Sequence, residues 1–300
     1  MDDYHPLIFG LAKRYRRLSQ KWTYRGQDVR SPADGNSWIA ARIRSANALL
    51  VSRIGASEAI GVAEFRRRGA VSDSTQQRLL DLSGVFPCED RAATQFCETY
   101  LDAIGQSDLI GIWSVTGEAG LIRDQAPTAV LAELRALEPY YHSDPWTVTL
   151  RGKRVLVIHP FARLIESQYA QRKHLFADDR ILPEFQSLQC LPAVQSIGGH
   201  PDFSSWAEAL KFQKVSIQAL DFDIALIGAG AYGPPLGAYV KSMGKQAIQM
   251  GGSLQILFGI KGKRWDEHAI ISKLYNEHWV RPGPQDRPAA YKKVEGGCYW

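Results

Sequence analysis

A glycine-rich turn follows an apolar run in the second half of the chain. Residues 222–233 read FDIALIGAGAYG, so Gly228, Gly230 and Gly233 have the spacing G-x-G-x-x-G between an expected strand and an expected helix. Glycines at this spacing let the backbone approach a pyrophosphate at a helix N-terminus, where free N–H groups and the helix dipole favour an anion. The segment predicts a phosphate-binding turn, and a plain tight turn between strand and helix is the alternative.

The residues after this turn do not suit a dinucleotide. A dinucleotide site carries an acidic residue about 20 positions further on, which binds the ribose hydroxyls. No Asp or Glu stands between Gly228 and Asp266, and Pro234 and Pro235 remove two N–H groups from the turn. We therefore favour a nucleotide site over an NAD site and keep an NAD(P)-dependent oxidoreductase as an alternative function.

A second turn, SRIGASE at 52–58, also follows an apolar run. Gly55 permits the tight turn, and Arg53 could hold a phosphate. Glu58 falls in the first turn of the next helix, where its carboxylate could act as a base or bind a metal. The alternative is that Glu58 only complements the positive end of the helix dipole.

Two more segments carry polar chemistry. His159 ends the run VIHPF and could be a hydrogen-bond donor, a base or a phosphate contact, or else a core histidine bonded to backbone. Lys261, Lys263 and Arg264 lie in GIKGKRW. Their cationic groups suit phosphate oxygens, and a solvated surface loop is the alternative.

A parallel sheet would bring these residues together. Apolar runs at 48–55, 108–114, 153–161 and 222–230 read as strands with helices between them, which is the pattern of βαβ units. We expect an α/β fold whose mostly parallel sheet is flanked by helices. Ligands of such sheets bind beyond the carboxyl ends of the strands. Four strand ends therefore carry the candidates: Arg53–Glu58, Trp113–Glu118, His159–Phe161 and Gly228–Gly233.

Three finer expectations come from the same pattern. Residues 126–140 read as a helix with Pro127 near its first turn. The run KVSIQAL at 214–220 reads as a strand. Asp221 and Asp223 precede a strand instead of following one, so we expect them at the edge of the sheet opposite the site.

Composition excludes several classes of protein. The chain has 300 residues, of which 45% are hydrophobic and 22% charged, so neither disorder nor a fibrous structure describes it. Four cysteines without a CxxC pair suggest neither zinc nor a disulfide framework, and reduced thiols fit a cytoplasmic protein. No run of eighteen apolar residues is present to span a membrane.

The net charge of +5 is modest. It suits an anionic small molecule, a phosphate-rich partner or an anionic membrane surface. The basic clusters are scattered and not interleaved with aromatic residues, so we do not expect nucleic acid as a partner. A basic helix expected at about 7–20 could touch the inner face of a membrane.

Several segments together resemble bacterial glycosyltransferases of the GT-D fold. They are SRIGASEA (52–59), GVFP (84–87), residues 144–161, residues 222–265, and the ending NEHWVRP…EGGCYW. The resemblance covers roughly residues 45 to 300, and its most specific part is 222–265. We therefore divide the chain into an N-terminal helical or irregular extension, 1–40, and a single glycosyltransferase domain, 41–300.

The resemblance implies a Rossmann-like fold and a reaction. Such enzymes transfer a sugar, here a hexosyl group, from a nucleotide-diphosphate sugar to a hydroxyl of a glycan or a lipid-linked glycan. They serve the synthesis of bacterial surface polysaccharides and glycoconjugates. On this reading the catalytic residues are Glu58 and His159. The donor and its diphosphate would contact Arg53, Gly55, Gly228, Gly230, Tyr232, Gly233, Lys261, Lys263 and Arg264.

One position departs from the family pattern. The family has a turn similar to S-R-F-G-D-G-E, and its Asp falls on Ala56 of this chain. One reading is that Glu58, with waters and the diphosphate, holds Mn²⁺ or Mg²⁺, although such cations prefer several oxygen ligands. Alternatively, basic residues replace the metal, or the chain has lost catalysis and is a non-catalytic nucleotide-sugar-binding partner protein.

Overall fold

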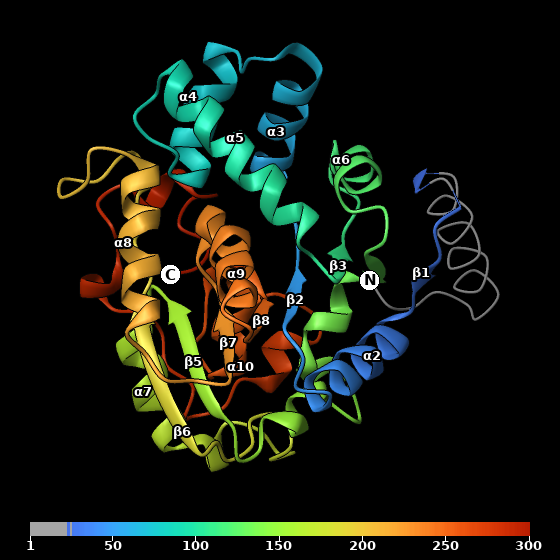
Figure 1. Cartoon of the computed structure of the whole chain (residues 1–300). Coiled ribbons are helices and arrows are strands. Elements are labelled where there is room, and N and C mark those ends of the chain that lie inside the picture. Colours follow the sequence, from blue (N-terminus) through green and yellow to red (C-terminus); the bar gives the residue numbers. More distant parts are fainter. Residues whose placement is uncertain (1–22, 25) are drawn as a thin grey trace.

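The computed structural model describes residues 23–24 and 26–300, and its centre is one eight-stranded sheet (Figure 1). The strand order is β1-β4-β3-β2-β8-β7-β5-β6, and every neighbouring pair is parallel. The expected α/β fold with a parallel, Rossmann-like sheet is confirmed. The strands are β1 Val29–Arg30, β2 Leu49–Ser52, β3 Leu109–Ile112, β4 Val130–Glu133, β5 Arg154–His159, β6 Ser187–Pro192, β7 Ile224–Ile227 and β8 Gln246–Gln249.

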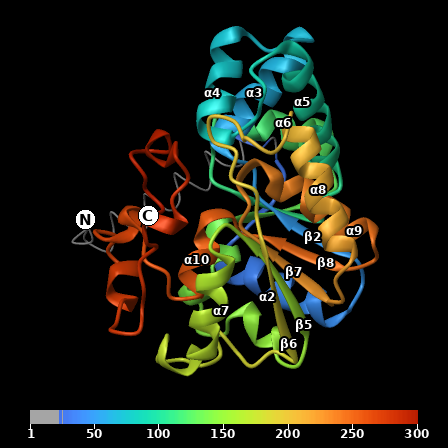
Figure 2. The same cartoon turned by 90° about the vertical axis from the view of Figure 1, so that its left-hand side faces the viewer.

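Helices cover both faces of the sheet. Figure 2 shows α8 and α9 on one face and α7 and α10 on the other. The buried apolar residues form one cluster beneath each set. The helices are α2 Pro32–Arg44, α3 Ala56–Arg68, α4 Asp73–Ser83, α5 Asp90–Gly105, α6 Glu118–Gln125, α7 Ala162–Ala170, α8 Trp206–Gln218, α9 Gly233–Ser242 and α10 Leu254–Leu257.

The central strands are buried from both sides. All four residues of β2 and of β7 are buried, as expected for inner strands of a covered parallel sheet, which read as continuous apolar runs. Helix α9 lies close to β2 because Gly237 has no side chain there. A Cβ at Gly237 would stand 2.6 Å from Cδ1 of Leu50.

Helices α3, α4 and α5 form a cap over the carboxyl ends of the strands (Figures 1 and 2). All three come from the connection between β2 and β3. The cap therefore covers the edge of the sheet at which ligands bind in this class of fold.

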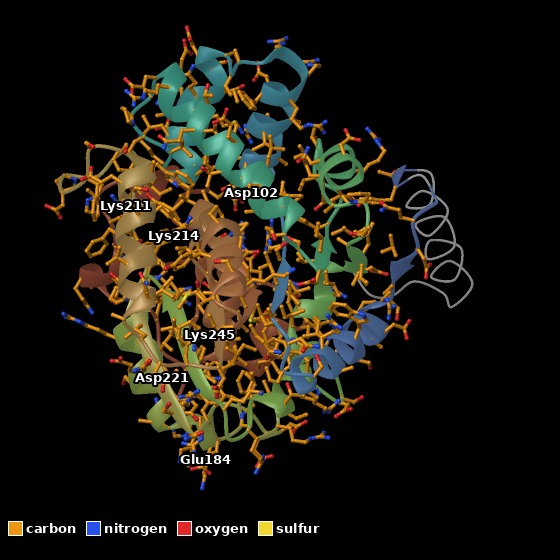
Figure 3. The ribbon with its side chains drawn as sticks, in the orientation of Figure 1. Asp102, Glu184, Lys211, Lys214, Asp221 and Lys245 are labelled. Carbon is orange, nitrogen blue, oxygen red and sulfur yellow. The ribbon has the colours of Figure 1, made fainter. Side chains whose placement is uncertain are left out.

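The opposite edge carries charged residues that hold the strands together. Asp221 and Asp223 both form ion pairs with Arg154, and Lys245 Nζ donates to the carbonyl oxygen of Phe222. Figure 3 shows Asp221 and Lys245 near the starts of β7 and β8. The expectation that the two aspartates lie away from the site is confirmed.

Two expected elements are wrong. Residues 126–140, expected as a helix, contain β4 and short 3-10 turns, because Val130–Glu133 forms a ladder between β1 and β3. Residues 214–220, expected as a strand, belong mostly to α8. Ala209, Gln213 and Ile217 recur every four residues and form the buried side of that helix.

The N-terminal boundary also differs in detail. Residue 40 falls inside α2, and β1 pairs with β4, so residues 29–40 belong to the α/β structure. The helix expected at about 7–20 lies outside the described residues. Within the part of the chain that the structure describes, no helix is both long and apolar enough to cross a membrane.

We predict that Leu50→Ala destabilises the fold by about 2–5 kcal/mol, because Leu50 is fully buried between β2 and α9. Urea unfolding measures the change. Val215→Ala on the exposed side of α8 is the control and should change stability by less than about 0.5 kcal/mol. Equal losses in the two variants would contradict this account of the core.

Candidate functional site

A cavity of about 390 Å³ lies at the carboxyl ends of the central strands. Its walls come from the segments after β2, β3, β5, β7 and β8, from the cap, and from the last residues of the chain. Strand β2 has β3 as its neighbour on one side and β8 as its neighbour on the other. From β2 the chain continues to β3, whereas the strands on the β8 side come from the second half of the chain. Such a switch in direction opens a crevice between strand ends, which is where open α/β sheets bind ligands.

Arg53 stands at the end of β2 beside this crevice. Its backbone N–H donates to Oε1 of the buried Gln249 at 2.8 Å, which fixes the turn to the end of β8. Its guanidinium lies 4.4 Å from the ring centroid of Trp113. Among the described residues, no carboxylate is in ion-pair contact with Arg53. The positive charge is therefore available to an anionic ligand.

Glu58 lines the cavity from the first turn of α3. Its carboxylate folds back over Gly55, since a Cβ on that glycine would stand 2.0 Å from Oε2. Burial raises the pKa of Glu58 above its ordinary value, and the charges of Arg53 and Arg78 oppose this. The pocket thus favours a proton on Glu58 more than water does.

The residues around Glu58 do not fit a divalent cation. Ala56 supplies no second carboxylate, burial favours the protonated form of Glu58, and two arginine charges act on it. The other cavity carboxylate, Glu295, pairs with Arg264. No group of three potential His, Cys, Asp or Glu ligands occurs within residues 23–24 and 26–300. A hard cation needs several oxygen ligands, which this donor set does not offer.

His159 ends β5 and lines the same cavity with its ring buried. Nδ1 accepts the backbone N–H of Phe161 at 3.0 Å, so the neutral ring carries its proton on Nε2. Burial lowers the pKa of His159 to about 3. The ring is therefore a neutral N–H donor at physiological pH, and its basic nitrogen is already occupied.

The three glycines of the turn after β7 have different surroundings. Gly228 allows the His159 ring to approach, because a Cβ there would stand 2.5 Å from Cδ2 of His159. Gly230 has a φ of 52° and lines the cavity with nothing near its missing side chain. Gly233 does not line the cavity but makes room for Gln249, whose Cγ would lie 2.8 Å from a Cβ.

Tyr232 lines the cavity, but neighbouring residues already engage its hydroxyl and its ring. The Tyr232 hydroxyl hydrogen-bonds to Ser196 at 2.7 Å and its ring stacks on Trp206, so it mainly fixes the turn. Lys261 and Lys263 lie outside the cavity. The Lys261 ammonium instead lies 5.3 Å from the ring centroid of Tyr275.

Arg264 does line the cavity, together with the last residues of the chain. Its guanidinium pairs with Glu295 and donates to the Tyr299 hydroxyl at 3.0 Å. Tyr299 packs directly over Gly252, since a Cβ on that glycine would stand 2.2 Å from the ring. The C-terminal segment therefore forms a wall of the site.

Sequence reasoning assigned no role to four residues that the fold brings to this edge, although it placed Trp113 at a candidate strand end. Arg78 of α4 lines the cavity and, within the described chain, has no ion-pair partner. Trp113 and Gln249 also line it. Glu138, which follows β4, lies near enough to feel the charge of Arg53, and burial raises its pKa to about 7. Only the strand-end positions of Trp113 and Gln249 could have indicated them.

Comparisons with known proteins give two structural likenesses. No family model matches the chain, and no curated protein matches it. A solved structure described as the highly conserved domain of unknown function 1792, with a distinct glycosyltransferase fold, is 12% identical. The match covers 90% of this chain and 96% of that one, with a TM-score of 0.46. A selenomethionine-substituted structure of that domain is also 12% identical. The match covers 88% of this chain and 95% of that one, with a TM-score of 0.44.

We predict that Glu58→Gln raises the melting temperature at pH 8 by a few degrees. Below pH 4.5, which is the ordinary pKa of a glutamate side chain, the substitution should have little effect. A raised carboxyl pKa means that the fold favours the protonated form. The contribution of protonated Glu58 to stability is therefore complete below the pKa that this residue has in the unfolded chain. It is lost as pH rises through the pKa that the residue has in the folded protein. Glutamine mimics the protonated side chain and removes that loss.

Thermal unfolding from pH 4 to 8 measures this difference. The control is Glu98→Gln, an exposed residue of α5, which should leave the pH profile of the wild type unchanged. A wild-type stability that increases from pH 5 to 8 relative to Glu58→Gln would contradict the burial of this carboxyl.

We also predict that Gly228→Ala destabilises the protein by about 1–3 kcal/mol. The new methyl group would stand 2.5 Å from His159 Cδ2 and 2.8 Å from the Gly251 carbonyl oxygen. Urea unfolding measures the change. Gly120→Ala in α6, with its nearest atom at 3.8 Å, should be neutral or stabilising because alanine favours a helix. Equal stability of Gly228→Ala and the wild type would refute the close packing.

Proposed function

We propose that the protein is a glycosyltransferase that uses a nucleotide-diphosphate sugar. The observation that carries this proposal is the Arg53 guanidinium, which lies at the switch point of a parallel sheet without an acidic partner among the described residues. A planar guanidinium in a partly covered cavity suits phosphate oxygens. The sequence resemblance to GT-D glycosyltransferases supports the same class of ligand.

The donor diphosphate lies, in this proposal, between Arg53 and the turn of residues 228–231. Arg53 and Arg78 contribute two positive charges, whereas the lining carboxylates are Glu58 and Glu295, and Glu295 is paired with Arg264. Charge therefore favours an anion without a divalent cation. As the bond to the sugar breaks, negative charge grows on the diphosphate, and the two arginines stabilise it.

His159 and Glu58 have separate tasks in the proposed reaction. The Nε2–H of His159 donates a hydrogen bond to the donor. The bond between the sugar carbon and the diphosphate oxygen breaks, and a bond from that carbon to the acceptor oxygen forms. The acceptor proton goes to Glu58 in its ionised form, since a carboxylate with a raised pKa is a stronger base than an exposed one.

The proposed setting is the synthesis of bacterial surface polysaccharide or glycoconjugate. The acceptor would be a glycan or a lipid-linked glycan, and a cytoplasmic enzyme would meet the latter at the inner face of the membrane. These assignments rest on the sequence resemblance alone.

A non-catalytic nucleotide-sugar-binding protein is the second candidate. Ala56 in place of the family Asp and the buried state of Glu58 favour it. An NAD(P)-dependent oxidoreductase has less support, because Gln249 ends the strand after the glycine turn and bonds to Arg53. A dinucleotide site carries an acid near this position.

We predict that UDP, GDP, dTDP or CDP raises the melting temperature, that NAD does not, and that Mn²⁺ or Mg²⁺ adds nothing. A ligand that binds the folded state stabilises it. Arg53→Ala should weaken this binding at least tenfold by calorimetry. The control, Arg67→Ala at the exposed end of α3, should bind like the wild type. Stabilisation by NAD alone, or by no nucleotide, would overturn the proposal.

A turnover assay separates the two candidates. Glu58→Gln should lower sugar transfer at least 100-fold while nucleotide binding persists, because the acceptor proton loses its base. The wild-type rate should rise with pH through the raised pKa of Glu58. Glu138→Gln is the matched control, since Glu138 also feels Arg53 but does not line the cavity. Absence of transfer and hydrolysis with every bound donor would favour the binding protein.

A further inference from the structure

Trp113 is an exposed indole at the rim of the cavity. It follows β3 directly and keeps 38% of its surface exposed. The other large apolar side chains exposed to this degree in the described chain are Phe212, Val215 and Ile270, and none of them lines the cavity. A single exposed apolar ring is common on protein surfaces, so the exposure alone points to no ligand; the position of this ring beside the cavity and its fixed orientation do.

The orientation of this ring is fixed from two sides. The indole Nε1–H donates to the carbonyl oxygen of Ile54 at 2.8 Å. The Arg53 guanidinium covers one face, 4.4 Å from the ring centroid. The side chain is therefore held in one position before any ligand arrives, with part of its surface still open.

The backbone under Trp113 is held at an energetic cost. Glu118 is fully buried, and its Oε2 accepts the N–H of Ser114 at 2.8 Å and that of Trp113 at 3.3 Å. The Tyr24 hydroxyl donates to the same oxygen at 2.7 Å. Ser114 has a φ of 63°, in the left-handed region that non-glycine residues rarely adopt.

A buried carboxyl and a left-handed serine both cost stability, and such costs concentrate at ligand sites. Here they serve to aim one side chain. The arrangement of Glu118, Ser114 and Trp113 is thus a built support for an open aromatic ring next to the phosphate-binding arginine.

We propose that Trp113 is the stacking platform for the nucleobase of the donor. This inference rests on the proposed function. A nucleoside diphosphate carries an anionic group and a flat aromatic base on one short linker. Arg53 would take the diphosphate, while the base stacks on the open surface of the indole. Stacking on a preset aromatic ring is tolerant of the kind of base.

The test compares nucleoside diphosphates with inorganic pyrophosphate, which lacks the base. Wild-type protein should bind UDP or GDP more tightly than pyrophosphate in calorimetry. Trp113→Ala should weaken nucleotide binding by about 5- to 150-fold and leave pyrophosphate binding within about twofold. Trp113→Phe, which keeps an aromatic face, should retain most of the nucleotide affinity.

Fluorescence gives a second measurement on the intact chain. Nucleotide should quench part of the wild-type tryptophan emission, and this quenching should disappear in Trp113→Phe. The melting temperature of each variant without ligand shows that it is folded, and Trp113→Phe, the smaller change, keeps the test valid if Trp113→Ala does not fold.

Three results would overturn the inference. Equal wild-type affinity for pyrophosphate and nucleotide would show that the base makes no contact. Equal weakening of both ligands by Trp113→Ala would show that Trp113 only positions Arg53. Undiminished nucleotide binding in Trp113→Ala would refute the platform while the proposed function stands. Failure of the wild type to bind either ligand would instead remove the proposed function, and this inference with it.

Discussion

The site depends on the charge of Arg53. Its half-buried guanidinium lies at the end of a central strand, and no carboxylate among the described residues is in ion-pair contact with it. The Arg53 charge lowers the pKa of five groups around it, against the larger effect of burial on each: Glu58, Tyr100, Glu138, Tyr140 and Tyr299. Its influence is wide because helices and the C-terminal segment exclude water, and charges interact more strongly where the effective dielectric is low.

The fold fixes this charge through contacts that begin far away in the sequence. Gly233 leaves space for Gln249, and Gln249 holds the backbone of Arg53. Trp113 covers the guanidinium from the end of β3, and buried Glu118 holds Trp113 in turn. Together these contacts give a positive site whose geometry exists before the ligand binds, which lowers the free-energy cost of binding.

Much of the fold could be predicted from the chain itself. The apolar runs that became β2, β3, β5 and β7 are continuous because inner parallel strands are buried on both faces. Elements with a weaker pattern were misread. Strand β4 resembled part of a helix, and the periodicity of α8 was mistaken for alternation in a strand. In both cases contacts with elements distant in sequence determine the structure, because the local sequence is compatible with either a helix or a strand.

The sequence by itself determined the class of fold and the strand ends that carry Arg53, Glu58, His159 and Gly228, because residue spacing and periodicity are local properties. Only the tertiary structure decided what those side chains can do. Burial makes His159 a neutral donor and favours a proton on Glu58, and packing turns Gly233 into a spacer. The tertiary structure also leaves Lys261 outside the cavity and brings Arg78 and Trp113 to its wall. Burial, charge and orientation depend on residues distant in sequence, so spacing along the chain does not specify them.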